Sequence, residues 1–159
     1  MMFMMRWSRP DIYNAVRGLS RQMSQPQAKH YKAMQSCMKY VLSTRNRGLL
    51  IKPKGKWNGS KGFKFRIGGR SDSDYAANTE DRRSISGGRT FLNEAPVVFR
   101  STTQRFVTLS VTEAETAAGV MVAQDMMYVY RLITSLMPTL NVCRSVFLTS
   151  IFSHSDLIL

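Results

Sequence analysis

Acidic residues stand at both ends of one segment of this basic chain. The segment begins with Asp72 and Asp74, in SDSDYA, and ends with Glu113 and Glu115, in TLSVTEAET. Hard divalent cations such as Mg²⁺ and Mn²⁺ take oxygen ligands, so carboxylates are the side chains that hold them. Metal ions held in this way stabilise the attacking and leaving oxygens when a phosphodiester is hydrolysed. The pattern suggests a metal site that faces nucleic acid.

The net charge indicates the kind of partner. The 159 residues include 23 Lys and Arg against 10 Asp and Glu, which gives a formal net charge of +13. An excess this large for the length favours a polyanionic partner, and nucleic acid is the first candidate. A soluble protein that merely happens to be basic is the weaker interpretation. With 43% hydrophobic residues, the chain has enough apolar material for a packed core.

Several other classes of protein are disfavoured. Cys37 and Cys143 are far apart and have no Cys or His at metal-ligand spacing, and His30 and His154 are isolated, so neither a disulfide framework nor a zinc site is indicated. The apolar opening is too short for a signal peptide. The tail at 142–159 contains charged residues and falls short of the roughly 20 apolar residues of a membrane helix. We therefore expect an intracellular protein, cytoplasmic or nuclear, without a membrane partner.

Two amphipathic helices are expected before residue 52. The first opens at Pro10 and Asp11 and ends at the break in Ser24-Gln25-Pro26, and the second follows it. Each has one apolar stripe, which we interpret as a packing face. The stripes consist of Ile12, Ala15, Val16, Leu19 and Met23 in the first helix, and of Tyr31, Met34, Met38, Val41 and Leu42 in the second.

A basic linker follows at residues 52–62. It mixes lysines with Gly, Pro, Asn and Ser, and it is the best domain boundary in the chain. A solvated loop and a surface that contacts phosphate and stacks on a base explain it equally well. The candidate nucleic-acid-binding residues here are Lys54, Lys56, Trp57 and Lys61.

Strands and then a long helix are expected after the linker. Phe63, Phe65 and Ile67 alternate as in a half-buried strand that runs toward Asp72. Residues 89–92 and 97–102 predict a hairpin around Asn93-Glu94, and 105–109 predict a third short strand. The spacing of Ser110 and Glu113 is that of a capping box. It opens an amphipathic helix whose apolar positions are Ala114, Ala117, Ala118, Met121, Val122, Val129, Leu132 and Leu136.

Three motifs give a more specific interpretation. DSDYA from Asp72, DRRSISG from Asp81 and LSVTEAE from Leu109, in this order, resemble the ribonuclease H domain of copia-type retrotransposon Pol polyproteins. The stretches RPDIYNAVRGLSRQMSQP and HYKAMQSCMKYVLSTRNRGLLI resemble the end of the reverse transcriptase that precedes it. The polymerase catalytic motifs lie upstream in such proteins and are absent here.

The resemblance implies an α/β (α+β) fold: a truncated ribonuclease H-like mixed sheet with a long helix, preceded by a two-helix remnant of reverse transcriptase. The implied domains are a helical remnant at 1–51, the basic linker at 52–62, a partial ribonuclease H-like domain at 63–137 and a divergent apolar tail at 138–159. We expect this tail to leave the edge of the sheet unpaired.

The resemblance also assigns the site. Asp72 matches the first-strand aspartate of the ribonuclease H core and Glu115 the helix-borne glutamate, so both are candidate catalytic residues and ligands of Mg²⁺ or Mn²⁺. Asp74 and Glu113 are weaker candidates, because the capping box already explains Glu113 and Asp74 would only share the face of Asp72.

Residues of the DRRSISG motif could contact nucleic acid. Arg82 and Arg83 are candidates for phosphate contact, although both could also be simply solvated. Gly87 and Gly88 are expected to give the turn its backbone freedom.

A third carboxylate is missing from the family pattern. The aspartate of an Asp-Asn pair should follow the long helix, and no such pair occurs after Glu115. Asp156 has the wrong spacing and context, and Asp125, inside the helix, is expected to be solvated. Two carboxylates are insufficient to hold two metal ions in catalytic geometry.

Three functions remain open. The first is a catalytically inactive Pol fragment that binds RNA/DNA hybrid or single-stranded nucleic acid, with the remainder of a Pol polyprotein as a further partner. The second is an active metal-dependent ribonuclease that cuts RNA in RNA/DNA hybrids. The third is a non-catalytic, basic nucleic-acid-binding module, for which the linker and the net charge suffice.

Overall fold

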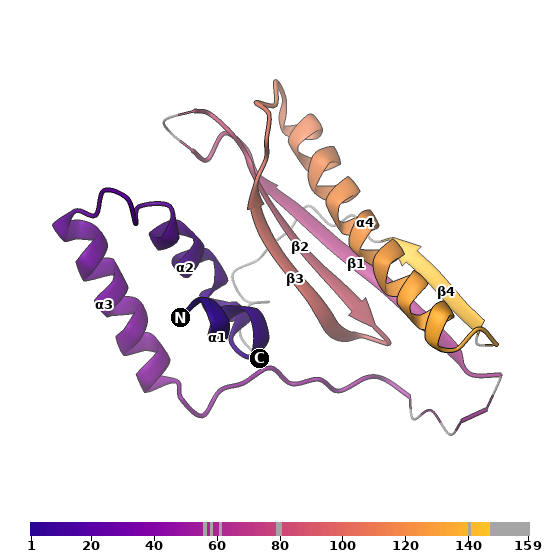
Figure 1. Ribbon diagram of the computed structural model, residues 1–159. Coiled ribbons are helices and arrows are strands. Elements are labelled where there is room, and N and C mark those ends of the chain that lie inside the picture. Colours follow the sequence, from indigo (N-terminus) through magenta and orange to yellow (C-terminus); the bar gives the residue numbers. More distant parts are fainter. Residues whose placement is uncertain (56, 58, 61, 79–80, 140, 147–159) are drawn as a thin grey trace. The chain divides into compact units, whose positions relative to one another are not determined.

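The chain divides into two compact units (Figure 1). The computed structural model describes residues 1–55, 57, 59–60, 62–78, 81–139 and 141–146, and for 141 and 144–146 the backbone alone. The first unit, Met1–Leu50, is helical, and the second, which begins at Ile51, contains a sheet and a long helix. Within the described residues, no helix has the length and apolarity needed to cross a membrane.

The helical unit is built from α1 (Met2–Trp7), the 3₁₀ turn η1 (Pro10–Ile12), α2 (Tyr13–Ser20) and α3 (Ala28–Ser43). The two predicted helices are therefore present. Its core consists of Met5, Ile12, Val16 and Cys37, with Met4, Tyr13 and Val41 packed against it. The sequence did not predict α1, because six residues are too few to display a helical period.

The predicted packing face of α3 is partly wrong. Tyr31 is 59% exposed and Leu42 is 68% exposed, whereas Cys37 is buried at 8%. Cys37 lies three residues after Met34 and four before Val41, so these three residues share one face of the helix. Periodicity alone favours the larger apolar side chains, so the predicted packing face was rotated by about one residue from the face that is buried.

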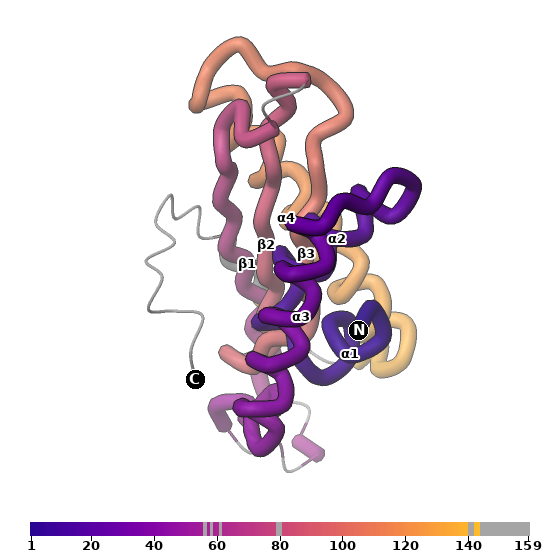
Figure 2. The backbone as a smooth tube through the Cα atoms, turned by 90° about the vertical axis from the view of Figure 1, so that its left-hand side faces the viewer, coloured from indigo at the N-terminus to yellow at the C-terminus, as the bar shows by residue number. Residues whose placement is uncertain are grey.

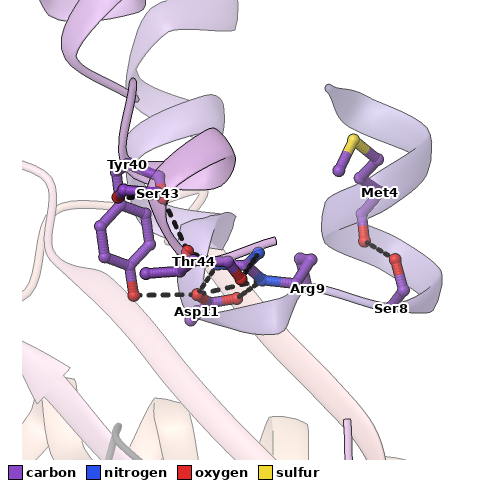
Figure 3. Close-up of polar contacts among 7 residues, drawn as sticks. All are labelled: Met4, Ser8, Arg9, Asp11, Tyr40, Ser43 and Thr44. Carbon is purple, nitrogen blue, oxygen red and sulfur yellow. Dashed lines mark hydrogen bonds and ion pairs between the residues drawn. The ribbon is translucent and has the colours of Figure 1, made fainter. Parts of the chain in front are cut away.

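A polar cluster joins η1 and the residue before it to the end of α3 (Figure 3). Arg9 is only 4% exposed, and its Nη2 lies 2.7 Å from Asp11 Oδ2. Arg9 also donates to the carbonyl oxygen of Thr44 at 3.0 Å and to its Oγ1 at 2.7 Å. The hydroxyl of Tyr40 donates to Asp11 Oδ2 at 3.0 Å. The hydrogen bond from Arg9, aided by that from Tyr40, lowers the pKa of Asp11 despite its burial.

The second unit holds a mixed four-stranded sheet. Its strands are β1 (Lys64–Asp74), β2 (Ile85–Leu92), β3 (Ala95–Thr103) and β4 (Asn141–Val146), and α4 (Val111–Leu136) lies between β3 and β4 in the chain. The order across the sheet is β3-β2-β1-β4. β1 pairs antiparallel with β2, and β2 with β3, whereas β4 pairs parallel with β1.

The predicted hairpin is present, but the predicted third strand is not. Asn93 and Glu94 have φ of 49° and 67°, the left-handed pair that a two-residue hairpin turn of β2 and β3 requires. Residues 105–109 form a loop, and Phe106 and Val107 are each 50% exposed. These apolar residues imitate a strand in the sequence. The loop lies instead against the turn that precedes β2, where the N–H of Gln104 donates to the carbonyl oxygen of Ser84 at 2.9 Å.

The segment after α4 also differs from expectation. The prediction that it leaves the edge of β1 unpaired is wrong, because β4 pairs with β1 from Lys64↔Asn141 to Gly69↔Val146. A parallel strand needs a long crossover connection, and α4 supplies one. The six residues NVCRSV do not match the family's sequence at this point, and the run is too short for its apolar residues to predict a strand.

The start of α4 is capped by Ser110 as predicted, but the Glu113 side chain bonds one residue earlier than in a capping box. Ser110 Oγ accepts from the N–H of Glu113 at 3.1 Å. The Glu113 carboxylate accepts from the N–H of Leu109 at 2.7 Å, one residue before the N-cap position that a capping box would use. Both interactions satisfy N–H groups at the start of the helix.

Two glycines let α4 approach the sheet. A Cβ atom on Gly69 would lie 2.4 Å from Val122 Cγ1, and one on Gly88 would lie 2.5 Å from Val122 Cγ2. Val122 belongs to the core of this unit, together with Ile67, Met126 and Val129. The predicted role of Gly87 and Gly88 in a turn is wrong, because both lie within β2; close packing explains Gly88.

Asp125 was expected to be solvated, and this is wrong. It is 6% exposed, and its Oδ1 lies 2.8 Å from Nη2 of Arg100 in β3. Burial raises the pKa of Asp125, and the charge and hydrogen bond of Arg100 oppose that rise. A charged residue on the packed face of a helix cannot be recognised from periodicity, because the partner that neutralises it lies elsewhere in the chain.

Candidate metal and nucleic-acid site

Asp72 and Glu115 lie together where the end of β1 meets the first turns of α4. Glu115 Oε1 accepts a hydrogen bond from the N–H of Ser73, the residue after Asp72, at 3.1 Å. Both carboxylates are half-buried. The described part of β4 pairs with β1 only as far as Gly69, so Ser73 lies beyond it. The approach of Asp72 and Glu115 that the resemblance implied is thus present in the structure.

The electrostatics of the pair are repulsive. Burial raises the pKa of Asp72, and the negative charges of Glu115 and, to a smaller extent, Asp74 raise it further. The N–H of Ser73 acts in the opposite direction. A divalent cation between the two carboxylates would relieve this repulsion, because its charge favours the ionised form of both.

The described residues do not complete a site with three ligands. Among them, no group of three His, Cys, Asp or Glu side chains is placed to hold a metal ion. Glu113 is engaged at the cap of α4 through Leu109. Asp74 is exposed at the end of β1. Asp156, the weak candidate for a third ligand, lies outside the described residues.

Two loops hold the start of α4 against the end of β1. The turn after β1 and the loop before α4 lie at the same end of the sheet in both views (Figures 1 and 2). Ser84 Oγ and Thr108 Oγ1, both buried, are 2.8 Å apart, and the hydroxyl of Tyr75 donates to the carbonyl oxygen of Leu109 at 3.3 Å. The sequence analysis missed these positioning residues, since a buried Ser or Thr has no periodic signature.

A buried glutamine makes a further connection at this end of the sheet. Gln104 Nε2 donates to the carbonyl oxygen of Ala114 and to Ser86 Oγ, each at 2.9 Å. It therefore links the loop, the helix that carries Glu115 and strand β2.

Those predicted nucleic-acid-binding residues that the structure describes do not form one patch. Lys54 lies at the hairpin turn, where its N–H donates to the carbonyl oxygen of Asn93 at 2.7 Å and its Nζ pairs with Glu94 at 2.7 Å. Trp57 packs edge-on against Phe65, with ring centroids 5.7 Å apart. Both residues lie near the start of β1, about 25 Å from Asp74 at the rise of an extended strand. Lys56 and Lys61 lie outside the described residues.

Arg82 and Arg83 lie in the turn after β1, at the same end of the sheet as Asp72. Both are exposed, Arg82 has a φ of 57°, and Arg83 Nε lies 3.6 Å from Asp81 Oδ2. Asn78 also donates to Asp81. This turn is therefore organised by Asp81, and it lies at the same end of the sheet as the acidic pair.

Comparisons with known proteins identify the family. The chain is 31% identical over 130 residues to the retrovirus-related Pol polyprotein from transposon RE1 of Arabidopsis thaliana, a match that covers 82% of the chain and 8% of that protein. It is 28% identical over 136 residues to the Pol polyprotein from transposon TNT 1-94 of Nicotiana tabacum, covering 86% of the chain and 10% of that protein. The chain belongs to the family of copia-type retrotransposon Pol polyproteins.

The match to these Pol polyproteins is local, since the chain spans a tenth or less of their length. The chain is also 38% identical over 114 residues to the secreted RxLR effector protein 161 of Plasmopara viticola, which covers 72% of the chain and 75% of that protein. No family model matches the chain, and no solved structure matches it significantly. Membership of the Pol family therefore rests on sequence.

Proposed function

We propose that this segment of a Pol polyprotein comprises the end of a reverse transcriptase and a partial ribonuclease H-like domain that binds nucleic acid and is catalytically inactive. In this proposal, residues 1–51 are the reverse transcriptase remnant, 52–62 the linker, and 63–137 together with the strand β4 (Asn141–Val146) the partial ribonuclease H-like domain. The observation that carries it is the hydrogen bond between Glu115 Oε1 and the N–H of Ser73, which holds the two candidate ligands together.

The sheet gives further support. Its order, β3-β2-β1-β4 with β4 parallel to β1, suits a ribonuclease H-like domain in which a central strand carries the first aspartate. Asp72 lies on β1, and Glu115 lies on the helix that crosses from β3 to β4. The two carboxylates would hold one Mg²⁺ or Mn²⁺ weakly, with water in the remaining positions.

We propose that the domain does not cleave RNA, because it has too few carboxylate ligands for two metal ions. A two-metal mechanism needs carboxylates enough to hold both ions on either side of the scissile phosphate. Asp72 and Glu115 provide a pair, and the sequence after Glu115 lacks the Asp-Asn pair of the family. The net charge of +13 supports binding of RNA/DNA hybrid or single-stranded nucleic acid independently of cleavage.

A hybrid binding and cleavage assay tests this proposal. The full chain is incubated with a labelled RNA/DNA hybrid, first in EDTA and then in Mg²⁺ or Mn²⁺. We expect salt-sensitive binding and no appreciable RNA cleavage in any condition. Metal-dependent cleavage that Asp72→Asn abolishes would instead establish the active ribonuclease, and an absence of binding even at low salt would refute the proposal.

A further inference from the structure

One face of the sheet carries arginine and phenylalanine side chains. Side chains alternate between the two faces of a strand. Gly69 and Gly88 face α4, because a Cβ atom on either would collide with Val122. Their neighbours Arg70 and Arg89 must therefore lie on the opposite face. Of the described elements in the second unit, α4 is the one helix. The burial along β2 shows which face this helix covers: Ser86, Gly88 and Thr90 are buried, whereas Ile85, Gly87, Arg89 and Phe91 are half-exposed.

The strand register aligns these side chains across the sheet. Arg70 pairs with Arg89, and Arg89 pairs with Phe99, so the three form one row across β1, β2 and β3. In the adjacent row, Gly68 pairs with Phe91. The guanidinium of Arg70 lies 5.6 Å from the ring centroid of Phe91, which independently places the two on the same face. Arg70 is exposed and the two phenylalanines are half-exposed.

The row on the other side leads toward the acidic pair. It consists of Asp72, Gly87 and Ser101, so two of its three members are small. This surface is therefore basic and aromatic over most of its width, with a carboxylate next to it.

We propose that this face, defined by the exposed Arg70 together with Phe91 and Phe99, binds single-stranded nucleic acid. Guanidinium groups pair with phosphate through parallel hydrogen bonds. Bases stack on aromatic side chains when a sheet face presents them, and only an unpaired strand exposes its bases for this. The inference rests on the proposed nucleic-acid binding, and it names the surface and the form of the ligand; it does not depend on a metal ion.

Fluorescence anisotropy with labelled oligo-dT and oligo-rU tests the inference, with EDTA present throughout. Phe99→Leu is expected to weaken binding to either single strand about tenfold, because one stacked base is lost. Its binding to duplex DNA should be unchanged. Arg70→Gln is expected to weaken binding to single strands about fivefold and to reduce the salt slope by about one.

Matched controls lie on the exposed side of α4. Tyr128, which is 66% exposed, is replaced by Leu, and the exposed Arg131 is replaced by Gln. Neither control should alter binding. Circular dichroism checks that Phe99→Leu is folded, and ultraviolet cross-linking of 5-iodouracil to the wild-type chain provides a second measurement, with adducts expected at Phe91 or Phe99.

The base dependence separates stacking from simple charge attraction. An abasic oligonucleotide should bind the wild type about tenfold more weakly than oligo-dT and should be insensitive to Phe99→Leu. Equal affinity for both oligonucleotides would overturn the inference, because binding would then rest on phosphate charge alone and not on stacked bases. If the two sheet variants bind like the wild type, this inference fails while the proposed function stands; if the wild type binds no nucleic acid, both fail.

Discussion

The N–H of Ser73 donates to Glu115 Oε1 across 3.1 Å, although 42 positions separate the two residues in the chain. This hydrogen bond joins the end of β1 to the first turns of α4. It also holds the carboxylate of Glu115 beside that of Asp72. The acidic pair is therefore assembled by the backbone, and its repulsion is a cost of the fold.

Replacing Asp72 by Asn should stabilise the protein at neutral pH. Because burial and neighbouring negative charge raise the pKa of Asp72 above 3.8, the folded state binds this proton more tightly than the unfolded state does. Stability linked to Asp72 is thus present at low pH and is lost as the pH rises from 3.8 through the higher pKa of the folded state. We expect Asp72→Asn to raise the Tm at pH 7 by about 1 to 3 °C.

Thermal unfolding across this pH range measures the effect. Glu94→Gln is the control, because Glu94 makes an exposed ion pair with Lys54 that contributes little. A fall in Tm for Asp72→Asn at pH 7, in the absence of metal, would show that the carboxylate is not under repulsion.

A methyl group on Gly69 should destabilise the second unit by about 1 to 3 kcal/mol, because it forces the core to overpack. The added Cβ would lie 2.4 Å from Val122 Cγ1. Combining Gly69→Ala with Val122→Ala should cost less than the sum of the two single changes. Gly62→Ala is the control, since nothing lies within 4 Å of a Cβ atom there. Urea unfolding of the four variants measures the coupling, and simple additivity would contradict the packing described here.

Removing Arg100 should expose the cost of burying Asp125. Arg100→Gln leaves this carboxylate without its ionic partner, and we expect a loss of about 1 to 2 kcal/mol at pH 7. The loss should shrink toward pH 3.8, because the pKa of Asp125, already raised by burial, rises further without Arg100 and the neutral acid is easier to bury. Urea unfolding at both pH values, with Arg131→Gln as the exposed control, measures this; a loss independent of pH would rule out the electrostatic explanation.

In the helical unit, Asp11→Asn should weaken the contact between α2 and α3. Arg9 is buried, and loss of its carboxylate partner is expected to cost about 2 kcal/mol. Tyr40→Phe removes only one hydrogen bond to Asp11 and should cost about 1 kcal/mol. The pKa of Asp11 is lowered in the folded state. The stability that its ionised carboxylate contributes should therefore be present above pH 3.8 and lost as the pH falls through the lower pKa of the folded state.

Hydrogen exchange of α3 amides reports the stability of the helical unit separately from the sheet. Ser36→Ala is a matched control on the exposed side of α3, where its Oγ bonds only to the carbonyl oxygen of Lys32. Equal protection in Asp11→Asn and in the wild type would contradict the proposed role of the cluster.

The sequence predicted the features that rest on local patterns. Alternation predicted β1, the pair Asn93-Glu94 predicted the hairpin, and Ser110 with Glu113 predicted the start of α4. Each of these signals lies within a few neighbouring residues. The nearness of Asp72 and Glu115 came from the family resemblance, because no local pattern relates residues so far apart.

Features that depend on tertiary contact were missed. The loop at 105–109 contains apolar residues that the sheet does not cover, so it was taken for a strand. Asp125 was taken for a surface residue because its partner Arg100 comes from β3. The strand β4 was not expected, since its stability comes from parallel pairing with β1 and not from its own short sequence.

Manganese binding tests the central claim most directly. Titration of the full chain with Mn²⁺, followed by electron paramagnetic resonance, should show one weak site in the wild type. Asp72→Asn and Glu115→Gln should each abolish it, while Asp81→Asn, in the neighbouring turn, should leave it unchanged. Equal Mn²⁺ affinity in the wild type and in Asp72→Asn would contradict the assignment of this pair as a metal site.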